Sequence, residues 1–77
     1  MISYEEYRAK VITHFRKGWK NLSDEEVEAY FEREGNDIIK DSYRVDIQKL
    51  KEGEITEQIL ENGCIWSVAY CLQLMYE

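Results

Sequence analysis

The chain of 77 residues carries 16 acidic and 10 basic side chains, a formal net charge of −6, and 44% hydrophobic and 13% aromatic residues. This length fits one domain, residues 1–77, and the hydrophobic content excludes a disordered chain. The negative charge disfavours nucleic acid as a general partner, because a phosphate backbone is bound by basic surfaces. Proline is absent and only four glycines occur, so we expect an all-α fold.

Capping residues mark three helix starts along the chain. Ser3 with Glu6, and Ser23 with Glu26, have the spacing of a capping box, and Thr56 opens the last helical segment. Glycines that follow apolar periodic segments are expected to end the helices in between. The sequence therefore predicts a compact antiparallel bundle of four helices at about residues 4–18, 24–34, 37–51 and 56–75.

Apolar side chains at helical spacing predict which faces of the first three helices enter the core. The expected core residues are Tyr4, Tyr7, Val11, Ile12, Phe15 and Trp19, then Val27, Tyr30 and Phe31, then Ile39, Tyr43, Ile47 and Leu50. Acidic residues three positions before basic ones support the third helix, as in the expected pair of Asp46 with Lys49. Gly35 separates the second helix from the third in this interpretation.

The last helix contains Gly63, yet we expect it to be continuous because one apolar stripe keeps its phase across the glycine. That stripe consists of Ile55, Ile59, Gly63, Trp66, Tyr70 and Leu74. A second apolar stripe follows in the C-terminal half, formed by Cys64, Ile65, Val68, Cys71, Leu72 and Met75. A helix that is apolar nearly all round is buried on most sides.

Two explanations of this surplus remain open. Either the last helix is the central and most apolar element, wrapped by the other three, or one of its faces meets another chain. The second explanation implies an interaction surface on the third and last helices, and large aromatic side chains would be its anchors. The candidate protein-interaction residues are Ile38, Val45, Ile59, Trp66, Tyr70 and Leu74.

The cysteines and the termini bear on the cellular compartment. Cys64 and Cys71 are seven residues apart, about 10.5 Å along a helix, which is beyond the reach of a disulfide. We interpret them as reduced core thiols, with an intermolecular or redox role, or metal binding, as the alternatives. The N-terminal residues resemble no secretory signal, and the apolar run 64–76 is shorter than the roughly 20 residues of a membrane span. We therefore expect a cytoplasmic protein without a membrane segment.

No pattern in the sequence indicates catalysis, a cofactor or a metal. His14 lies at the edge of an apolar stripe without a nearby nucleophile or orienting partner, so we interpret it as a boundary residue. Glu25, Glu28 and Glu32 share a helix face that either is simply solvated or binds a divalent cation, although no calcium-loop signature is present. We expect no enzyme, no bound metal and no evident small-molecule substrate.

Two segments carry a resemblance to known proteins. The helix start Ser23–Val27 and the segment Gly63–Cys71, in a short acidic chain, resemble small uncharacterised α-helical proteins encoded on bacterial conjugative elements and phages. The resemblance implies an accessory or regulatory binding role and assigns no functional residue.

The leading hypothesis is a non-enzymatic helical interaction or regulatory module that associates with itself or with a protein partner through its last helix. The alternative is an acidic decoy that mimics nucleic acid. In that case the carboxylates of Glu25, Glu28 and Glu32 would occupy the basic cleft of a DNA-binding protein.

Overall fold

The computed structural model describes residues 1–76, which contain helices and no strand, as the composition predicts. Some helical segments are joined by π-helical turns, in which the backbone hydrogen bond spans five residues. In chain order the elements are α1 (Tyr4–Gly18), α2 (Asp24–Tyr30), a first π turn (Phe31–Gly35), α3 (Asn36–Lys51), α4 (Glu57–Ile59), a second π turn (Leu60–Cys64) and α5 (Ile65–Tyr76). The prediction of an all-α fold is confirmed.

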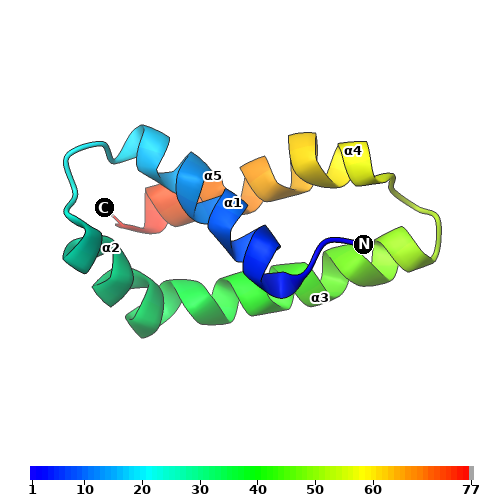
Figure 1. Ribbon diagram of the computed structural model, residues 1–77, viewed down its shortest axis with the longest axis horizontal. Helices are drawn as coiled ribbons and strands as arrows, with labels where there is room; N and C mark the ends of the chain where they lie inside the picture. The colour runs from blue at the N-terminus through cyan, green and yellow to red at the C-terminus, as the bar shows by residue number, and fades with distance from the viewer. Residues whose placement is uncertain (77) are drawn as a thin grey trace.

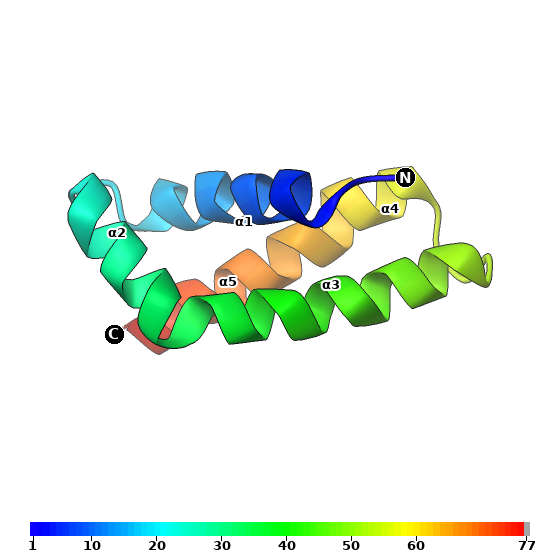
Figure 2. The same cartoon turned by 60° about the horizontal axis from the view of Figure 1, so that its bottom comes forward.

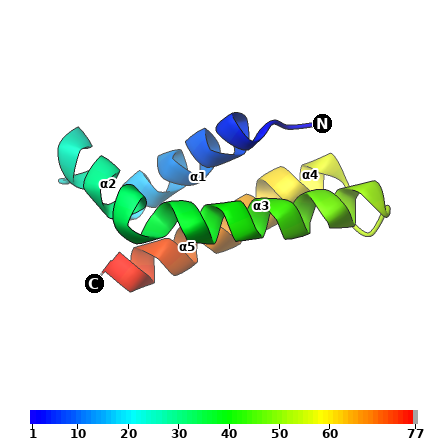
Figure 3. The ribbon, with the colours of Figure 1, turned by 90° about the horizontal axis from the view of Figure 1, so that it is seen from below.

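The predicted break at Gly35 is wrong, because α2, the first π turn and α3 form one bent helix. Gly35 has helical backbone angles, φ −65° and ψ −38°, and the Asn36 N–H donates to the Phe31 carbonyl oxygen. The two expected helices, 24–34 and 37–51, therefore merge, and residues 1–76 contain three long helices instead of four. Figure 3 shows the bend between α2 and α3.

Packing explains why this glycine does not stop the helix. Gly35 is buried, and a Cβ added there would overlap the ring of Phe31, which lies across it. The glycine thus makes room for an aromatic side chain. Gly53 does end a helix in the expected way, because it has φ +76° and follows α3 closely. A positive φ is the conformation that favours glycine at such an end.

The last helix is continuous through Gly63, from α4 through the second π turn into α5. The Ile65 N–H donates to the Leu60 carbonyl oxygen, which makes one wide turn. A π turn adds about one residue to the turn and so changes the phase of side chains before and after it. The apolar stripe that the sequence carries across Gly63 is therefore not one face of the folded helix.

The three long helices lie roughly along one direction in a body of 37 × 19 × 18 Å. Figure 2 shows α1 and α3 on opposite sides, with α5 crossing between and behind them, and Figure 1 shows α4 near the N-terminus. α5 packs most extensively against α1 and makes less contact with α3. The hydroxyls of Ser3, Ser23 and Thr56 accept backbone N–H bonds at the expected helix starts, and Ser23 with Glu26 forms a complete capping box.

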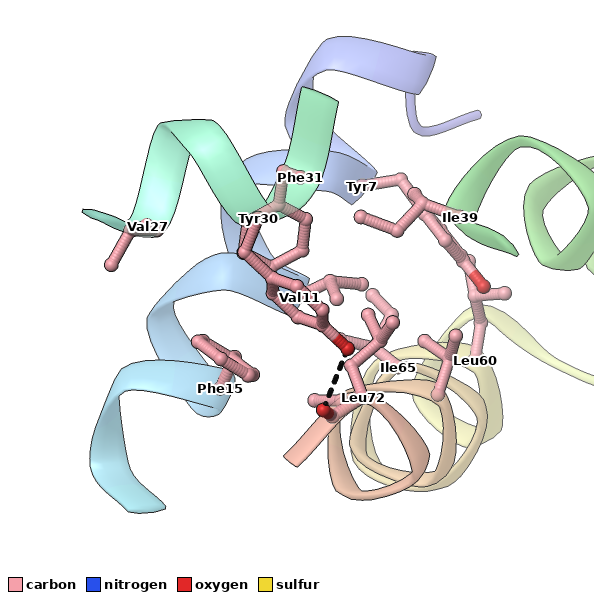
Figure 4. Packing of buried hydrophobic residues seen from close by; sticks show 12 residues of the cluster. Tyr7, Val11, Phe15, Val27, Tyr30, Phe31, Ile39, Leu60, Ile65 and Leu72 are labelled. Atoms are coloured by element: carbon pink, nitrogen blue, oxygen red, sulfur yellow. Dashed lines mark hydrogen bonds between the residues drawn. The ribbon is translucent and has the colours of Figure 1, made fainter. Parts of the chain in front are cut away.

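The core forms where the three helices meet (Figure 4). The buried apolar side chains are Tyr7, Val11, Phe15, Val27, Tyr30, Phe31, Ile39, Leu60, Ile65, Val68, Ala69 and Leu72. Tyr30 donates its hydroxyl hydrogen bond to the Leu72 carbonyl oxygen at 3.0 Å, the dashed line in Figure 4. The predicted stripes of the first two helices thus supply much of the core.

The last helix is the most apolar one and lies between α1 and α3, but the explanation in which the other helices enclose it is wrong. With three helices instead of four, α5 has only two long neighbours, so one of its sides stays open. Trp66, Tyr70 and Leu74, which belong to the apolar stripe across Gly63 and to the candidate interaction residues, are 49%, 60% and 52% exposed. The second stripe supplies three of the four buried residues of α5, Ile65, Val68 and Leu72; the fourth is Ala69.

Candidate functional site

An exposed apolar surface lies on the side of α5 that faces away from the core. We call it the α5 face and define it by Trp66, Tyr70 and Leu74, which follow one another at helical spacing. Each of these side chains is about half exposed or more. Single exposed apolar residues are ordinary, but a row of large ones on one helix is typical of an interaction surface.

The α5 face carries no formal charge of its own, because α5 contains no Asp, Glu, Lys or Arg. Basic groups of α1 border it on one side. Lys10 forms an ion pair with Glu61 just before α5, and Lys17 lies over the Trp66 ring, with its Nζ atom 5.1 Å from the ring centroid. The Lys17 ammonium group is therefore placed for a cation–π contact with the indole.

The ring of His14, which belongs to α1, packs against the same indole ring. Its ring centroid lies 4.2 Å from that of Trp66, and the planes are tilted by 36°. The His14 Nδ1 atom is buried and has no hydrogen-bond partner within residues 1–76. Burial lowers the pKa of His14 below 6.5, and the positive charges of Lys17 and Lys10 lower it further. The side chain that the sequence places at a boundary therefore packs against the exposed tryptophan.

The structure brings together only some of the predicted interaction residues. Trp66, Tyr70 and Leu74 share the α5 face, whereas Ile59 precedes the second π turn and lines a groove together with the half-buried Ile38. Val45 is 46% exposed on α3, in a separate hollow formed by α3 and the loop after it. Val45 is therefore not part of the α5 face.

A groove between α3 and the last helix was not predicted. We call it the α3–α5 groove; it encloses about 420 Å³. Its lining consists of Ile38, Ser42, Asp46, Ile59, Gly63, Cys64, Ser67, Val68 and Cys71. The groove exists because α5 packs closely on α1 and more loosely on α3.

Asp46 is the buried charged residue of the groove, with 9% of its surface exposed. The Tyr7 hydroxyl donates to its Oδ2 atom at 2.6 Å. Burial raises the pKa of Tyr7 well above its usual value, and the Asp46 carboxylate raises it further. The expected ion pair of Asp46 with Lys49 is absent from residues 1–76, where the carboxylate faces Tyr7 instead. The sequence did contain a signal, because Asp46 is seven residues from Ile39 and so shares its apolar stripe.

Both cysteines are free. Cys64 is half-buried, and its pKa is raised first by burial and then by the charge of Asp46, so its thiol stays protonated. Cys71 is exposed at the edge of the groove. Only Cys64 therefore has the environment expected for a core thiol.

The acidic face of α2 is exposed and partly neutralised. Glu28 lies 3.7 Å from a guanidinium nitrogen of Arg8, and Asp24 lies 2.6 Å from one of Arg16. Glu25 and Glu32 are exposed on the same bent helix. Within residues 1–76 no group of three or more His, Cys, Asp or Glu side chains is arranged to hold a metal ion.

The fold and its exposed surface define a small all-α protein of three long helices with one apolar face left open. Comparison with known proteins gives no match to a family model, to a curated protein or to a solved structure. Among the helices of residues 1–76, none has both the length and the apolar content that a bilayer crossing requires.

Proposed function

We propose that this protein is a helical interaction module that self-associates, two copies covering each other's α5 face. The main support for self-association is the exposure of Trp66, Tyr70 and Leu74. Each of these side chains is about half exposed or more, and the helix that holds them has no charged residue. Covering such a surface requires little desolvation of charged groups. It also removes apolar area from water, which favours association.

A second copy is the occupant we propose, because the α5 face fits a partner of its own kind. Most soluble oligomers are symmetric dimers, in which one patch packs against the identical patch of the other subunit. The α5 row itself adds no like-charge repulsion when it pairs with itself, although each chain has a net charge of −6; of the basic groups that border it, Lys10 is already paired with Glu61 and Lys17 lies over the Trp66 ring.

Trp66 is suited to anchor the contact. His14 and Lys17 hold its ring in place in the single chain. A side chain that is already ordered loses less conformational entropy on association, and tryptophan and tyrosine are frequent among the residues that dominate interface energies. Trp66 and Tyr70 are one helical turn apart, so both rings meet the partner on the same side.

The test is the molar mass in solution, measured by light scattering after size exclusion over a range of concentrations. The wild-type chain should approach twice the mass of one chain as concentration rises. Tyr70→Lys and Leu74→Lys should stay monomeric, whereas Val45→Lys, which adds the same charge at a comparably exposed apolar position on α3, should dimerise normally. A wild-type chain that stays monomeric at every concentration, or equal effects of all three variants, would refute the proposal.

The geometry gives less support to the acidic decoy, because Arg8 and Arg16 already neutralise part of the α2 carboxylates. The two functions differ in salt dependence, since an apolar contact is much less screened than a contact between charges. We also propose a cytoplasmic location, since Cys64 and Cys71 are free thiols and such thiols persist in reducing compartments. An accessory or regulatory binding role, as the resemblance implies, is consistent with this module.

A further inference from the structure

The α3–α5 groove contains a buried carboxylate that has no ion-pair partner in the described part of the chain. Asp46 lines the groove and is nine-tenths buried. Its hydrogen bond comes from the neutral hydroxyl of Tyr7, and no basic group within residues 1–76 forms an ion pair with it. Lys49 is the nearby cation on the same helix, but its side chain is exposed to solvent. A buried carboxylate without a cation is costly, and a positive ligand would offset that cost.

The rest of the groove sets the shape and polarity of an occupant. Ile38, Ile59 and Val68 supply apolar surface, and Ser42 and Ser67 supply hydroxyl groups. The volume of about 420 Å³ falls within the range of ligand pockets, roughly 300–1,000 Å³. Such pockets combine mainly apolar walls with a few polar groups that fix the orientation of the ligand.

We propose that the α3–α5 groove binds an alkylammonium or alkylguanidinium group, with the cation on the Asp46 carboxylate and the apolar stem against Ile38, Ile59 and Val68. A charge-assisted hydrogen bond of this kind is stronger than one between neutral groups. The same chemistry occurs in a free amine and in a lysine or arginine side chain of a polypeptide. This site is separate from the α5 face and does not depend on self-association.

The test is a titration of the ¹⁵N-labelled full chain with n-butylammonium and n-butylguanidinium ions, followed by amide chemical shifts at constant ionic strength. We expect saturable shifts at Ser42, Cys64 and Ser67, with dissociation constants in the millimolar range. n-Butanol has the same stem without the charge and should bind at least about tenfold more weakly. Shifts that never saturate, or equal binding of butanol, would overturn the proposal.

Two variants distinguish the effect of the groove carboxylate on cation binding from the effect of surface charge in general. Asp46→Asn keeps an oxygen that accepts from Tyr7 but removes the charge, and it should weaken binding at least about tenfold. Asp41→Asn removes an exposed charge that lies 3.4 Å from Arg44 on the same helix, and it should leave binding unchanged. If both variants behave like the wild type, Asp46 does not hold the cation and the proposal is wrong.

A third variant keeps the test decisive if Asp46→Asn disturbs the fold, which circular dichroism would show. Ser67 is exposed on α5 and lines the groove, so Ser67→Lys introduces a competing ammonium group at its edge. This variant should abolish binding of both ions; undiminished binding would count against the site.

A capped Ala-Lys-Ala peptide distinguishes the two sources of the cation, a polypeptide side chain and a free amine. Peptide binding comparable to that of n-butylammonium indicates a polypeptide side chain, and binding of the free amine alone indicates a small molecule.

Discussion

Two glycines within π turns should respond to alanine in opposite ways. Gly63→Ala places a methyl group where, apart from the adjacent backbone of its own helix, no heavy atom lies within 4 Å, so the variant gains helix propensity of up to about 1 kcal/mol. Gly35→Ala gains a similar amount but forces its methyl group onto the Phe31 ring. Phe31 is fully buried and packs edge-on against Phe15, with ring centroids 5.2 Å apart, so it has little room to move.

The difference between the two variants therefore isolates the cost of overpacking, which is typically about 1–3 kcal/mol. Gly35→Ala should unfold at a lower urea concentration than Gly63→Ala, and its melting temperature should be lower by about 4–8 °C for each kcal/mol. Both variants are measured at one low protein concentration, because self-association would add to the apparent stability. Equal stability of the two variants, or a more stable Gly35→Ala, would refute the packing account of Gly35.

Three further changes test other parts of the molecule. Tyr7→Phe leaves the Asp46 carboxylate without its donor and should cost about 1–3 kcal/mol in urea unfolding; no loss would show that the bond contributes nothing. Because the pKa of His14 is lowered in the folded state, the free energy of unfolding should fall as pH drops below 6.5, and His14→Gln should reduce that fall. Cys71 should react with a thiol reagent before Cys64, and a fast phase that survives in Cys71→Ser would contradict this assignment.

The helix starts and most of the core could be predicted because their signals are local. Ser23 with Glu26 forms its capping box within one turn, and Val27 and Tyr30 follow at helical spacing. These features depend on neighbours within a few residues. The helix start is therefore correct even though the helix that it opens continues much further than expected.

The continuation through Gly35 could not be predicted from local rules. A glycine between two apolar segments is usually an end signal, and only the packing of Phe31 shows why this glycine stays helical. The π turn at Leu60–Cys64 has a similar effect on the last helix. It shifts the phase by about one residue, so the sequence could not tell which of the two apolar stripes would be inside.

The α3–α5 groove depends on three segments that are distant in sequence. Tyr7 meets Asp46 across 39 positions, and the groove opens only because α5 packs on α1 in preference to α3. An acidic residue in phase with an apolar stripe indicates a buried carboxylate. The pattern does not indicate which group the carboxylate contacts. For the α5 face, the candidates Trp66 and Leu74 came from the excess of apolar residues, and their exposure follows from the number of helices.

Nuclear Overhauser effects between isotope-labelled and unlabelled copies of the chain address the α5 face at the level of single residues. In a mixed sample at a concentration where the mass is that of a dimer, the Leu74 methyl groups of one copy should show intermolecular effects to the Tyr70 or Trp66 rings of the other. A dimer whose intermolecular effects arise only from other helices, or a sample that remains monomeric, would contradict the account.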